Sequence, residues 1–267
     1  MRPLVVTRPQ PEAALWVQQL QAAGQAAVAC IPMLEIGPCQ NPLAQAAVRA
    51  ALAQLHTYNA LMFVSGNAVR YMVRNFQSQG VCPQPTTRLW APGPGTAQAL
   101  RDHGFAAQHI DQPSSDAAQF DSEALWAQVA LQVQPGWRIL LVRGSTPEAD
   151  SPATGHGRQW LTEQLLQRGA QVDFAPVYER SAPVLTPAMQ TSIAQLRAQS
   201  AIWLFSSSEC LQNLVSCVSN TSWQDQTALV THPKIAQQAR QLGFGRVIHT
   251  QPTVHAVAGS IKSLHDL

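Results

Sequence analysis

Charged residues are scarce in this chain, and they are not clustered. Only 12% of its 267 residues are Asp, Glu, Lys or Arg, and the formal net charge is +2. The sequence has no block of Lys and Arg, which argues against a protein that binds nucleic acid or an anionic membrane. No apolar run approaches the length of about 18 residues that a membrane-spanning helix needs. The chain opens directly into Leu4–Thr7 without a long apolar stretch, so we also expect no signal peptide.

The cysteine and histidine patterns indicate neither disulfides nor a metal site. The five cysteines are odd in number and show no CxxC spacing. Most of them lie in strand or helix patterns, where a free cysteine behaves as a small apolar residue. This favours free thiols in the reducing cytoplasm. The eight histidines show neither an HExxH motif nor paired metal spacing, so we expect no metal site.

The familiar catalytic motifs are missing as well. Pro92–Gly95 lacks the third glycine of a dinucleotide fingerprint, and the chain has no phosphate-binding loop and no GxSxG motif. Acidic residues that could act in pairs are few, since Glu35, Glu148, Asp150 and Glu179 fall in predicted loops or linkers. An active site in this chain would therefore work by holding and shaping its ligand rather than by strong acid and base groups.

What the sequence does contain is an internal repeat. When Arg88–Pro113 is shifted by 139 positions onto Thr227–Pro252, eight of 26 positions are identical without a gap, where chance would give about two. Ala60–Val73 matches Ala201–Leu214 in the same way. A third pair joins the segment that starts at Leu4 to the one that starts at Ile139, with small insertions. Three units are thus written twice, in the order a-b-c-a′-b′-c′.

Short apolar strands alternate with amphipathic helices along both copies, which predicts parallel sheets with helices on both faces. We predict strands at Leu4–Thr7, Ala27–Ile31, Leu61–Val64, Leu89–Ala91, Ala107–Ile110, Ile139–Val142, Val172–Ala175, Ile202–Phe205, Ala228–Val230 and Arg246–His249. We predict helices at Pro11–Ala23, Leu43–Leu55, Asn67–Phe76, from the Pro94 turn to Gly104, from Asp121 or Ser122 to Val133, up to Arg168, and at Pro187–Gln199, Glu209–Cys217, Lys234–Leu242 and Val254–Leu264. Gly144–Gly157 reads as a mobile surface loop, because it holds two prolines and three glycines.

The repeat permits two domain divisions. The chain could be cut once, near Pro135, or the two domains could exchange one unit each. In the second arrangement the chain leaves the first domain after unit a and returns to it after unit a′. Two extended segments bounded by proline, at about 34–38 and 176–181, lie where that exchange needs linkers.

Small, hydroxylic or basic residues follow the predicted strands. In parallel sheets, ligands bind at the carboxyl ends of strands, where helix N-termini present free N–H groups. The turns at those ends are 7–9, 65–67, 92–96, 143–145, 206–208 and 231–234. Each turn alone could simply cap a helix. Six of them together favour a ligand that carries several carboxylates or phosphates.

With these turns in place, the chain resembles the uroporphyrinogen-III synthase family over essentially its whole length. The resemblance is carried by Val6–Pro9, Phe63–Val69, Pro92–Ala97, Leu141–Gly144, Val177–Arg180 and Phe205–Ser208. It implies two α/β domains joined by a two-stranded linker with the active site in the cleft between them. The expected domains are residues 1–35 with 181–267, and 39–176. It also implies a reaction without cofactor, in which the linear tetrapyrrole hydroxymethylbilane loses water and closes with inversion of its last ring.

The resemblance also assigns roles to residues. Tyr178 matches the linker tyrosine of the family and is our candidate for assisting departure of the hydroxyl group. The alternative is a tyrosine packed at a domain edge with its hydroxyl in solvent. The candidate substrate-binding residues are Arg8, Ser65, Gly66, Asn67, Pro94, Thr96, Arg143, Gly144, Ser206, Ser207, Ser208, His232 and Lys234. The two arginines could instead form ion pairs between domains.

Three departures from the family pattern affect these assignments. Ser65-Gly66 and Ser206-Ser207 each stand where the family usually has Ser-Pro, and His232-Pro233-Lys234 replaces Gly-Pro-x-Thr. Two other functions therefore stay open. The chain could be a two-lobed protein that binds an anion without chemistry, or an inactive relative that serves as a partner for neighbouring pathway enzymes. We expect a monomer whose substrate is the small linear tetrapyrrole, and the preceding enzyme of the pathway is the macromolecular partner that the resemblance suggests.

Overall fold

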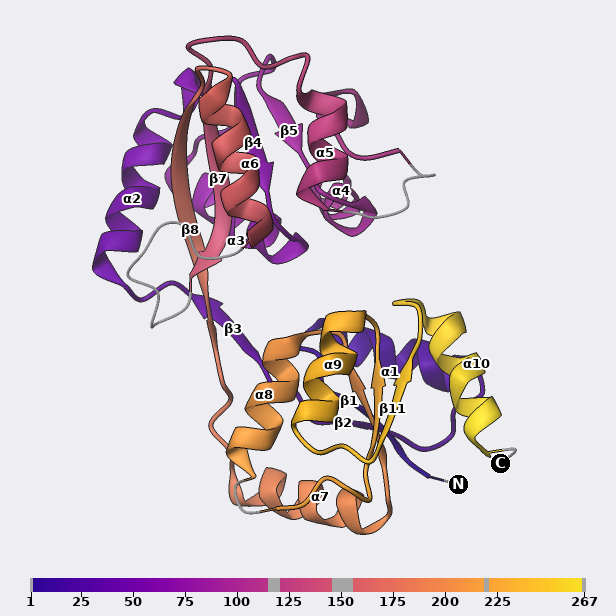
Figure 1. Cartoon of the computed structure of the whole chain (residues 1–267). Helices are drawn as coiled ribbons and strands as arrows, with labels where there is room; N and C mark the ends of the chain where they lie inside the picture. Colours follow the sequence, from indigo (N-terminus) through magenta and orange to yellow (C-terminus); the bar gives the residue numbers. More distant parts are fainter. Residues whose placement is uncertain (1, 115–120, 146–155, 219–220, 266–267) are drawn as a thin grey trace. The chain divides into compact units, whose positions relative to one another are not determined.

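The computed structural model describes residues 2–114, 121–145, 156–218 and 221–265. The chain folds into two compact units, one made of Met1–Ile36 with Ser181–Leu267 and the other of Gly37–Arg180. We call them the discontinuous unit and the continuous unit and describe each by itself (Figure 1). Both are α/β units built on parallel strands, which confirms the predicted fold class. Among the described residues, no helix has the length and apolar character needed to cross a membrane.

The discontinuous unit has a five-stranded sheet in the order β11-β10-β9-β1-β2. Its strands are β1 (Leu4–Val6), β2 (Val28–Cys30), β9 (Ile202–Phe205), β10 (Thr227–Val230) and β11 (Arg246–His249). Its helices are α1 (Glu12–Ala22), α7 (Pro187–Ala198), α8 (Ser208–Cys217), α9 (Pro233–Gln241) and α10 (Val254–His265). Strand β1 pairs with β9, so the two separate segments of this unit share one sheet.

Successive strand residues point to opposite faces, and this alternation divides the core of the discontinuous unit in two. Val5, Trp203 and Phe205 pack on one face against residues of α7, α8 and α9. Leu4, Val6 and Leu204 pack on the other face against residues of α1 and α10. Every residue of β9 and β10 is buried, and apart from Thr227 these strands are apolar rather than alternating.

The continuous unit has a six-stranded sheet in the order β3-β8-β7-β4-β5-β6. Its strands are β3 (Glu35–Pro38), β4 (Ala60–Phe63), β5 (Arg88–Trp90), β6 (Ile110–Asp111), β7 (Arg138–Ser145) and β8 (Gln171–Ser181). Its helices are α2 (Pro42–Ala53), α3 (Gly66–Gln79), α4 (Pro94–Asp102), α5 (Ser122–Val129) and α6 (His156–Gln167), with single 3₁₀ turns at Leu55–Thr57 and Ala107–His109. Helices α5 and α6 cover one face of the sheet, where they pack against the buried Met62 of β4 and Leu141 of β7. Helix α3 packs against α4.

Three predicted elements are wrong in part. The strand expected at Ala107–Ile110 is mostly the 3₁₀ turn Ala107–His109, and β6 is only the two residues that pair with β5. The helix expected to reach Val133 ends at Val129, and residues 130–132 form turns instead. The loop expected at Gly144–Gly157 is strand at its start and helix at its end, while residues 146–155 lie outside the described residues.

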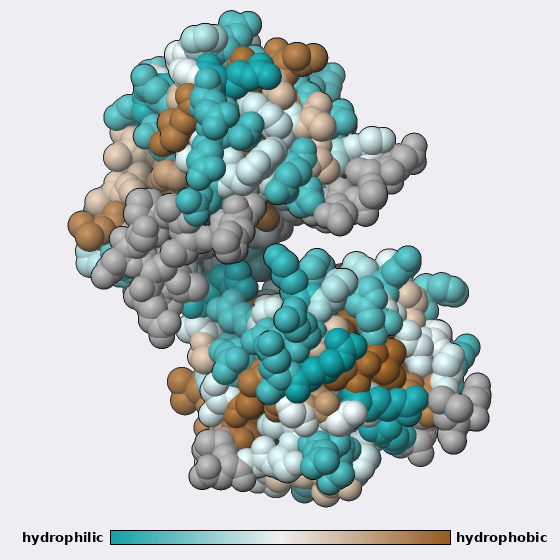
Figure 2. Space-filling model, in the orientation of Figure 1, coloured by the Kyte–Doolittle hydropathy of each residue, from teal (hydrophilic) through white to brown (hydrophobic). Residues whose placement is uncertain are grey.

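Large apolar side chains that stay exposed are spread over the chain. They are Leu15, Leu43, Leu131, Leu166 and Val184, and each belongs to a different element or connection. Figure 2 shows the apolar residues of one face interrupted by hydrophilic ones.

Candidate active site

In the continuous unit, Tyr178 lies at the edge where strands β4 and β7 end. Its side chain is only 4% exposed, and its hydroxyl oxygen lies 3.2 Å from Ser65 Oγ. Ser65 follows β4 and caps α3, because its Oγ accepts a hydrogen bond of 3.2 Å from the Ala68 amide. The alternative considered from the sequence, a tyrosine at a domain edge with its hydroxyl in solvent, does not match this contact with Ser65.

Gly144 provides the surface on which the Tyr178 ring lies. Strand β8 pairs with β7 in a register that places Gly144 beside Tyr178, after an irregularity between Arg143 and Gly144. A Cβ atom at position 144 would come within 2.5 Å of Tyr178 Cζ, closer than real Cβ contacts allow. Tyr71 of α3 adds a second ring, whose centroid is 5.8 Å from that of Tyr178. Two predicted site residues, Ser65 and Gly144, thus both contact the predicted Tyr178.

Helices α3 and α4 begin side by side at this edge. Gly66 opens α3, and a Cβ there would lie 3.6 Å from Ala99 of α4, so the two helices approach closely. Asn67 has a buried Oδ1 that accepts no hydrogen bond from the described residues. Helix α4 starts at Pro94 after the Gly93 cap, whose lack of a side chain leaves the first turn without a side-chain cap. Its free N–H groups suit an anionic group of a ligand.

The remaining two predicted residues of the continuous unit are more enclosed. Thr96 lies in the first turn of α4 and is 7% exposed. Arg143 is 8% exposed, and its guanidinium carbon lies 5.1 Å from the centroid of the Phe174 ring. Arg143 is therefore held against its own unit, and a ligand would meet at most the edge of its side chain.

In the discontinuous unit, the candidate residues lie at the ends of β1, β9 and β10. Arg8 follows β1, where Nη1 lies 3.8 Å from Glu12 Oε2 and the guanidinium carbon lies 4.2 Å from the Trp16 ring centroid. This ion pair is within one unit, unlike the interdomain pair considered from the sequence. Burial lowers the pKa of Arg8, although Glu12 and Cys210 oppose that effect. Its buried Nε donates to no described residue.

Ser206, Ser207 and Ser208 follow β9 directly. Ser207 caps α8, since its Oγ accepts a hydrogen bond of 3.2 Å from the Glu209 amide. Ser206 is half-buried and Ser208 is exposed in the first turn of the helix. The hydroxyl of Ser208 is therefore the one most open to a ligand.

The turn after β10 places a lysine in the first turn of a helix. His232 caps α9, and its Nδ1 accepts a hydrogen bond of 3.1 Å from the Lys234 amide. Lys234 is exposed in the first turn of α9. A cation at a helix N-terminus interacts unfavourably with the helix dipole. Lys234 therefore does not stabilise α9. Its position is consistent with a residue that binds an anion.

Comparison with known proteins decides which family this arrangement belongs to. A family model described as uroporphyrinogen-III synthase HemD matches residues 15–258. The chain belongs to the uroporphyrinogen-III synthase family. Among curated relatives, the uroporphyrinogen-III synthase of Escherichia coli is 30% identical over 247 residues, which cover 90% of this chain and 92% of the relative. That of Synechococcus elongatus is 28% identical over 234 residues, or 87% and 81% of the two chains.

Solved structures of this family share the fold. A mutant uroporphyrinogen III synthase from Thermus thermophilus matches with a TM-score of 0.59 at 17% identity, covering all of both chains. The uroporphyrinogen-III synthetase of Helicobacter pylori also gives 0.59, at 18% identity, covering 99% of this chain and all of the other. At such low identity these likenesses establish the fold alone.

Tyr71 is a member of the site that sequence reasoning missed. The family resemblance marks Tyr178 and the turn at Ser65, but Tyr71 lies inside α3, where an aromatic residue reads as part of an apolar helix face. Its ring meets Tyr178, which is 107 positions away. Its position six residues after Ser65, on a helix that starts at the predicted site, is the one signal that pointed to it. No group of three or more His, Cys, Asp or Glu in the described part of the chain could hold a metal ion.

Proposed function

We propose that this chain is a uroporphyrinogen-III synthase, a hydro-lyase that needs no cofactor. It closes hydroxymethylbilane to uroporphyrinogen III with loss of water and inversion of the last ring. The family match over residues 15–258 supports this function, and the observation that carries it is the contact of Tyr178 with Ser65 and Gly144. A small residue, a hydroxyl and a buried phenol meet where the family resemblance expects the chemistry.

The geometry gives the phenol a preferred direction. Ser65 Oγ already accepts the Ala68 amide proton, so its own hydrogen is available to the phenol oxygen 3.2 Å away. With that oxygen accepting from Ser65, the phenolic O–H is free to donate to the departing hydroxyl group of the substrate. Tyr178 thus assists departure of the hydroxyl, and Ser65 positions it.

Loss of the hydroxyl leaves a resonance-stabilised cation that closes without help to the symmetric isomer. The enzyme must instead hold the last ring so that its substituted carbon attacks, which forms a spiro intermediate that reopens and closes inverted. Positioning of this kind contributes up to about 7–11 kcal/mol in well-oriented systems. We propose that the strand-end turns bind the eight carboxylates of the substrate. Arg8 and Lys234 supply positive charge, and the first turn of α4 supplies backbone N–H groups.

The decisive experiment supplies freshly generated hydroxymethylbilane to the purified protein, oxidises the products and separates the isomers. We expect isomer III to be enriched over the control without enzyme. Tyr178→Phe should lower turnover at least tenfold and change substrate affinity little, because the ring keeps its contacts and loses only the hydroxyl. Binding of the substrate without enrichment would support an anion-binding protein, and absence of both would support an inactive relative.

We further propose that the enzyme acts as a monomer in the cytoplasm. Five cysteines present as free thiols support a reducing compartment. The dispersal of exposed apolar side chains over separate elements supports a single chain. Light scattering of the purified protein tests the second point, and a mass of twice 28.9 kDa would contradict it.

A further inference from the structure

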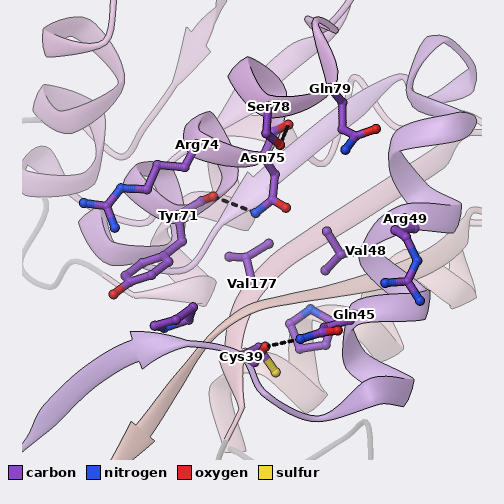
Figure 3. A pocket seen from close by; sticks show the side chains of 12 residues that line it. Cys39, Gln45, Val48, Arg49, Tyr71, Arg74, Asn75, Ser78, Gln79 and Val177 are labelled. Carbon is purple, nitrogen blue, oxygen red and sulfur yellow. Dashed lines mark hydrogen bonds between the residues drawn. The ribbon is translucent and has the colours of Figure 1, made fainter.

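We propose that the continuous unit carries a second binding site, for a small organic dianion with an apolar ring. The site is a pocket of about 460 Å³ beside α2 and α3 (Figure 3). Pockets of roughly 300–1,000 Å³ are the usual size for small molecules in proteins. Tyr71, which also contacts Tyr178, is the residue that this pocket shares with the candidate active site; none of the candidate residues at the strand ends lines it, so the proposal goes beyond the proposed function.

The middle of the pocket is apolar. Val48 of α2 and Val177 of β8 lie between the polar side chains in Figure 3, and Pro38 and Pro176 add further apolar surface. The ring of Tyr71 forms part of the same wall. This apolar surface favours an organic ring over an inorganic ion, because only the ring gains free energy by burying apolar surface.

Arginine side chains lie on two sides of this apolar surface. Figure 3 shows Arg74 with Tyr71 on one side and Arg49 with Gln45 on the other. The guanidinium carbon of Arg74 lies 5.1 Å from the centroid of the Tyr71 ring, which orients that side chain. Two guanidinium groups held apart by an apolar surface are complementary to two acidic groups held apart by an apolar ring.

The described residues that line the pocket carry positive charge and no negative charge. Among the described residues that line it, none is acidic. Neither Arg49 nor Arg74 takes part in an ion pair with another described residue. Glu179 lies next to the lining residue Cys39, and its Oε1 accepts from Cys39 Sγ and from the amides of Gln40 and Asn41. The two arginines of the lining outnumber this one carboxylate, so the net charge around the pocket is positive and favours an anion.

The neutral polar side chains are held in place by the chain itself. Gln45 donates to the Cys39 carbonyl at 3.0 Å, Asn75 to the Tyr71 carbonyl at 2.8 Å and Ser78 to the Asn75 carbonyl at 3.0 Å. They shape the rim, and the arginines remain the strongest donors. The ligand chemistry is a five- or six-membered aromatic ring with two carboxylates, either as a free molecule or as one ring of a tetrapyrrole.

The test uses the full chain labelled at its valine methyl groups, with isophthalate as the free ring dianion and uroporphyrin as the tetrapyrrole. We expect isophthalate to shift the methyl signals of Val48 and Val177 but not that of Val230 in the other unit. Arg49→Gln and Arg74→Gln should each weaken binding about tenfold by calorimetry, as for the loss of one charge-assisted contact. Arg70→Gln is the matched control, since Arg70 lies on α3 and does not line the pocket.

The outcomes separate this site from the proposed function. Shifts of the same two methyl groups by uroporphyrin identify a tetrapyrrole ring as the ligand, and shifts by isophthalate alone identify a free molecule. The proposal is overturned if neither probe shifts them, if benzoate binds as well as isophthalate, or if Arg70→Gln weakens binding as much as the pocket variants. Enrichment of isomer III tests the strand-end site independently, because Arg49 and Arg74 are not part of it.

Discussion

Gly144 is the residue on which the position of Tyr178 depends. The tyrosine ring lies where a side chain at 144 would otherwise be, and any Cβ there displaces it. The need for glycine comes from this approach and not from backbone strain, since Gly144 has no left-handed φ. Position 144 therefore links strand pairing to the chemistry of the site.

We expect Gly144→Ala to lower turnover at least tenfold while the protein still folds, with a loss of about 1–3 kcal/mol in the free energy of unfolding from overpacking. Gly259→Ala is the control, because a Cβ at that exposed helical position meets nothing within 4 Å. It should leave turnover unchanged and stabilise the protein by up to about 1 kcal/mol. Steady-state kinetics and urea unfolding measure both. Normal turnover in Gly144→Ala would show that catalysis does not depend on the Tyr178 ring lying over Gly144 of β7.

Lys234 offers a second test at the scale of one residue, since stability and binding should move in opposite directions. Lys234→Thr removes a cation from the start of α9 and should raise the free energy of unfolding by about 0.3–1 kcal/mol. The same change should raise KM by about 2- to 5-fold, as for loss of one exposed ion pair. Lys262→Thr is the control, because Lys262 lies in the last turn of α10, where a cation is favourable. An unchanged KM in Lys234→Thr would remove Lys234 from the site.

Among the secondary-structure elements, the start of β7 is fixed by a buried tyrosine. The Tyr58 hydroxyl donates to Asp173 Oδ2 at 2.8 Å, and Arg138 Nη2 donates to the same oxygen at 2.6 Å. The guanidinium carbon of Arg138 also lies 4.8 Å from the Tyr58 ring centroid. Burial, together with the hydrogen bond and the charge of Asp173, raises the pKa of Tyr58 despite the opposing charge of Arg138.

This raised pKa predicts a loss of stability in alkali. Above about pH 10 the unfolded chain releases the Tyr58 proton while the folded chain keeps it, so the contribution of Tyr58 is full below pH 10 and falls as the pH rises further. Urea unfolding at about pH 8 and pH 10.5 should show a smaller loss in Tyr58→Phe than in the unchanged protein. The cysteines titrate in both proteins, and their effect cancels in the comparison. Equal losses would mean that Tyr58 ionises as easily in the folded chain as in the unfolded one.

The elements that sequence predicts well are those fixed by local pattern. Strands β9 and β11 have the predicted bounds, Ile202–Phe205 and Arg246–His249, because a run of strand-forming residues ends at turn residues on each side. The end of β7 was missed, since Gly144 and Ser145 are strand only through their pairing with Tyr178 and Glu179 of β8. Such pairing joins residues more than 30 positions apart, and local pattern does not contain it.

The same limit applies to the site. The resemblance to a family supplied Tyr178 and Ser65 separately, on the strength of short motifs. Their contact, and the part of Tyr71 in it, depend on β8 running past the end of β4 in the folded chain. Patterns along the sequence locate turn residues, whereas the packing of β8 decides which of them meet.

At the scale of the whole molecule, the two sequence-based divisions of the chain make opposite predictions. In the structure, β4 pairs with β7 and β7 pairs with β8, so a cut near Pro135 would remove two central strands from the continuous unit. The core of that unit also combines Met62 and Trp90 with Ile139 and Leu161 from beyond the cut. Residues 37–180, by contrast, contain every one of these partners.

We therefore expect the fragment 37–180 to fold alone, with a helical circular dichroism spectrum and one cooperative urea transition. The fragment 1–135 should remain largely unfolded, because it keeps β4, β5 and α5 but lacks the central strands β7 and β8 and helix α6. A fusion of 1–36 to 181–267 through a short Gly-Ser linker should fold as well, since β1 and β9 pair directly. Cooperative folding of 1–135, with 37–180 unfolded, would mean that the chain divides once in sequence order and that the exchange of units is wrong.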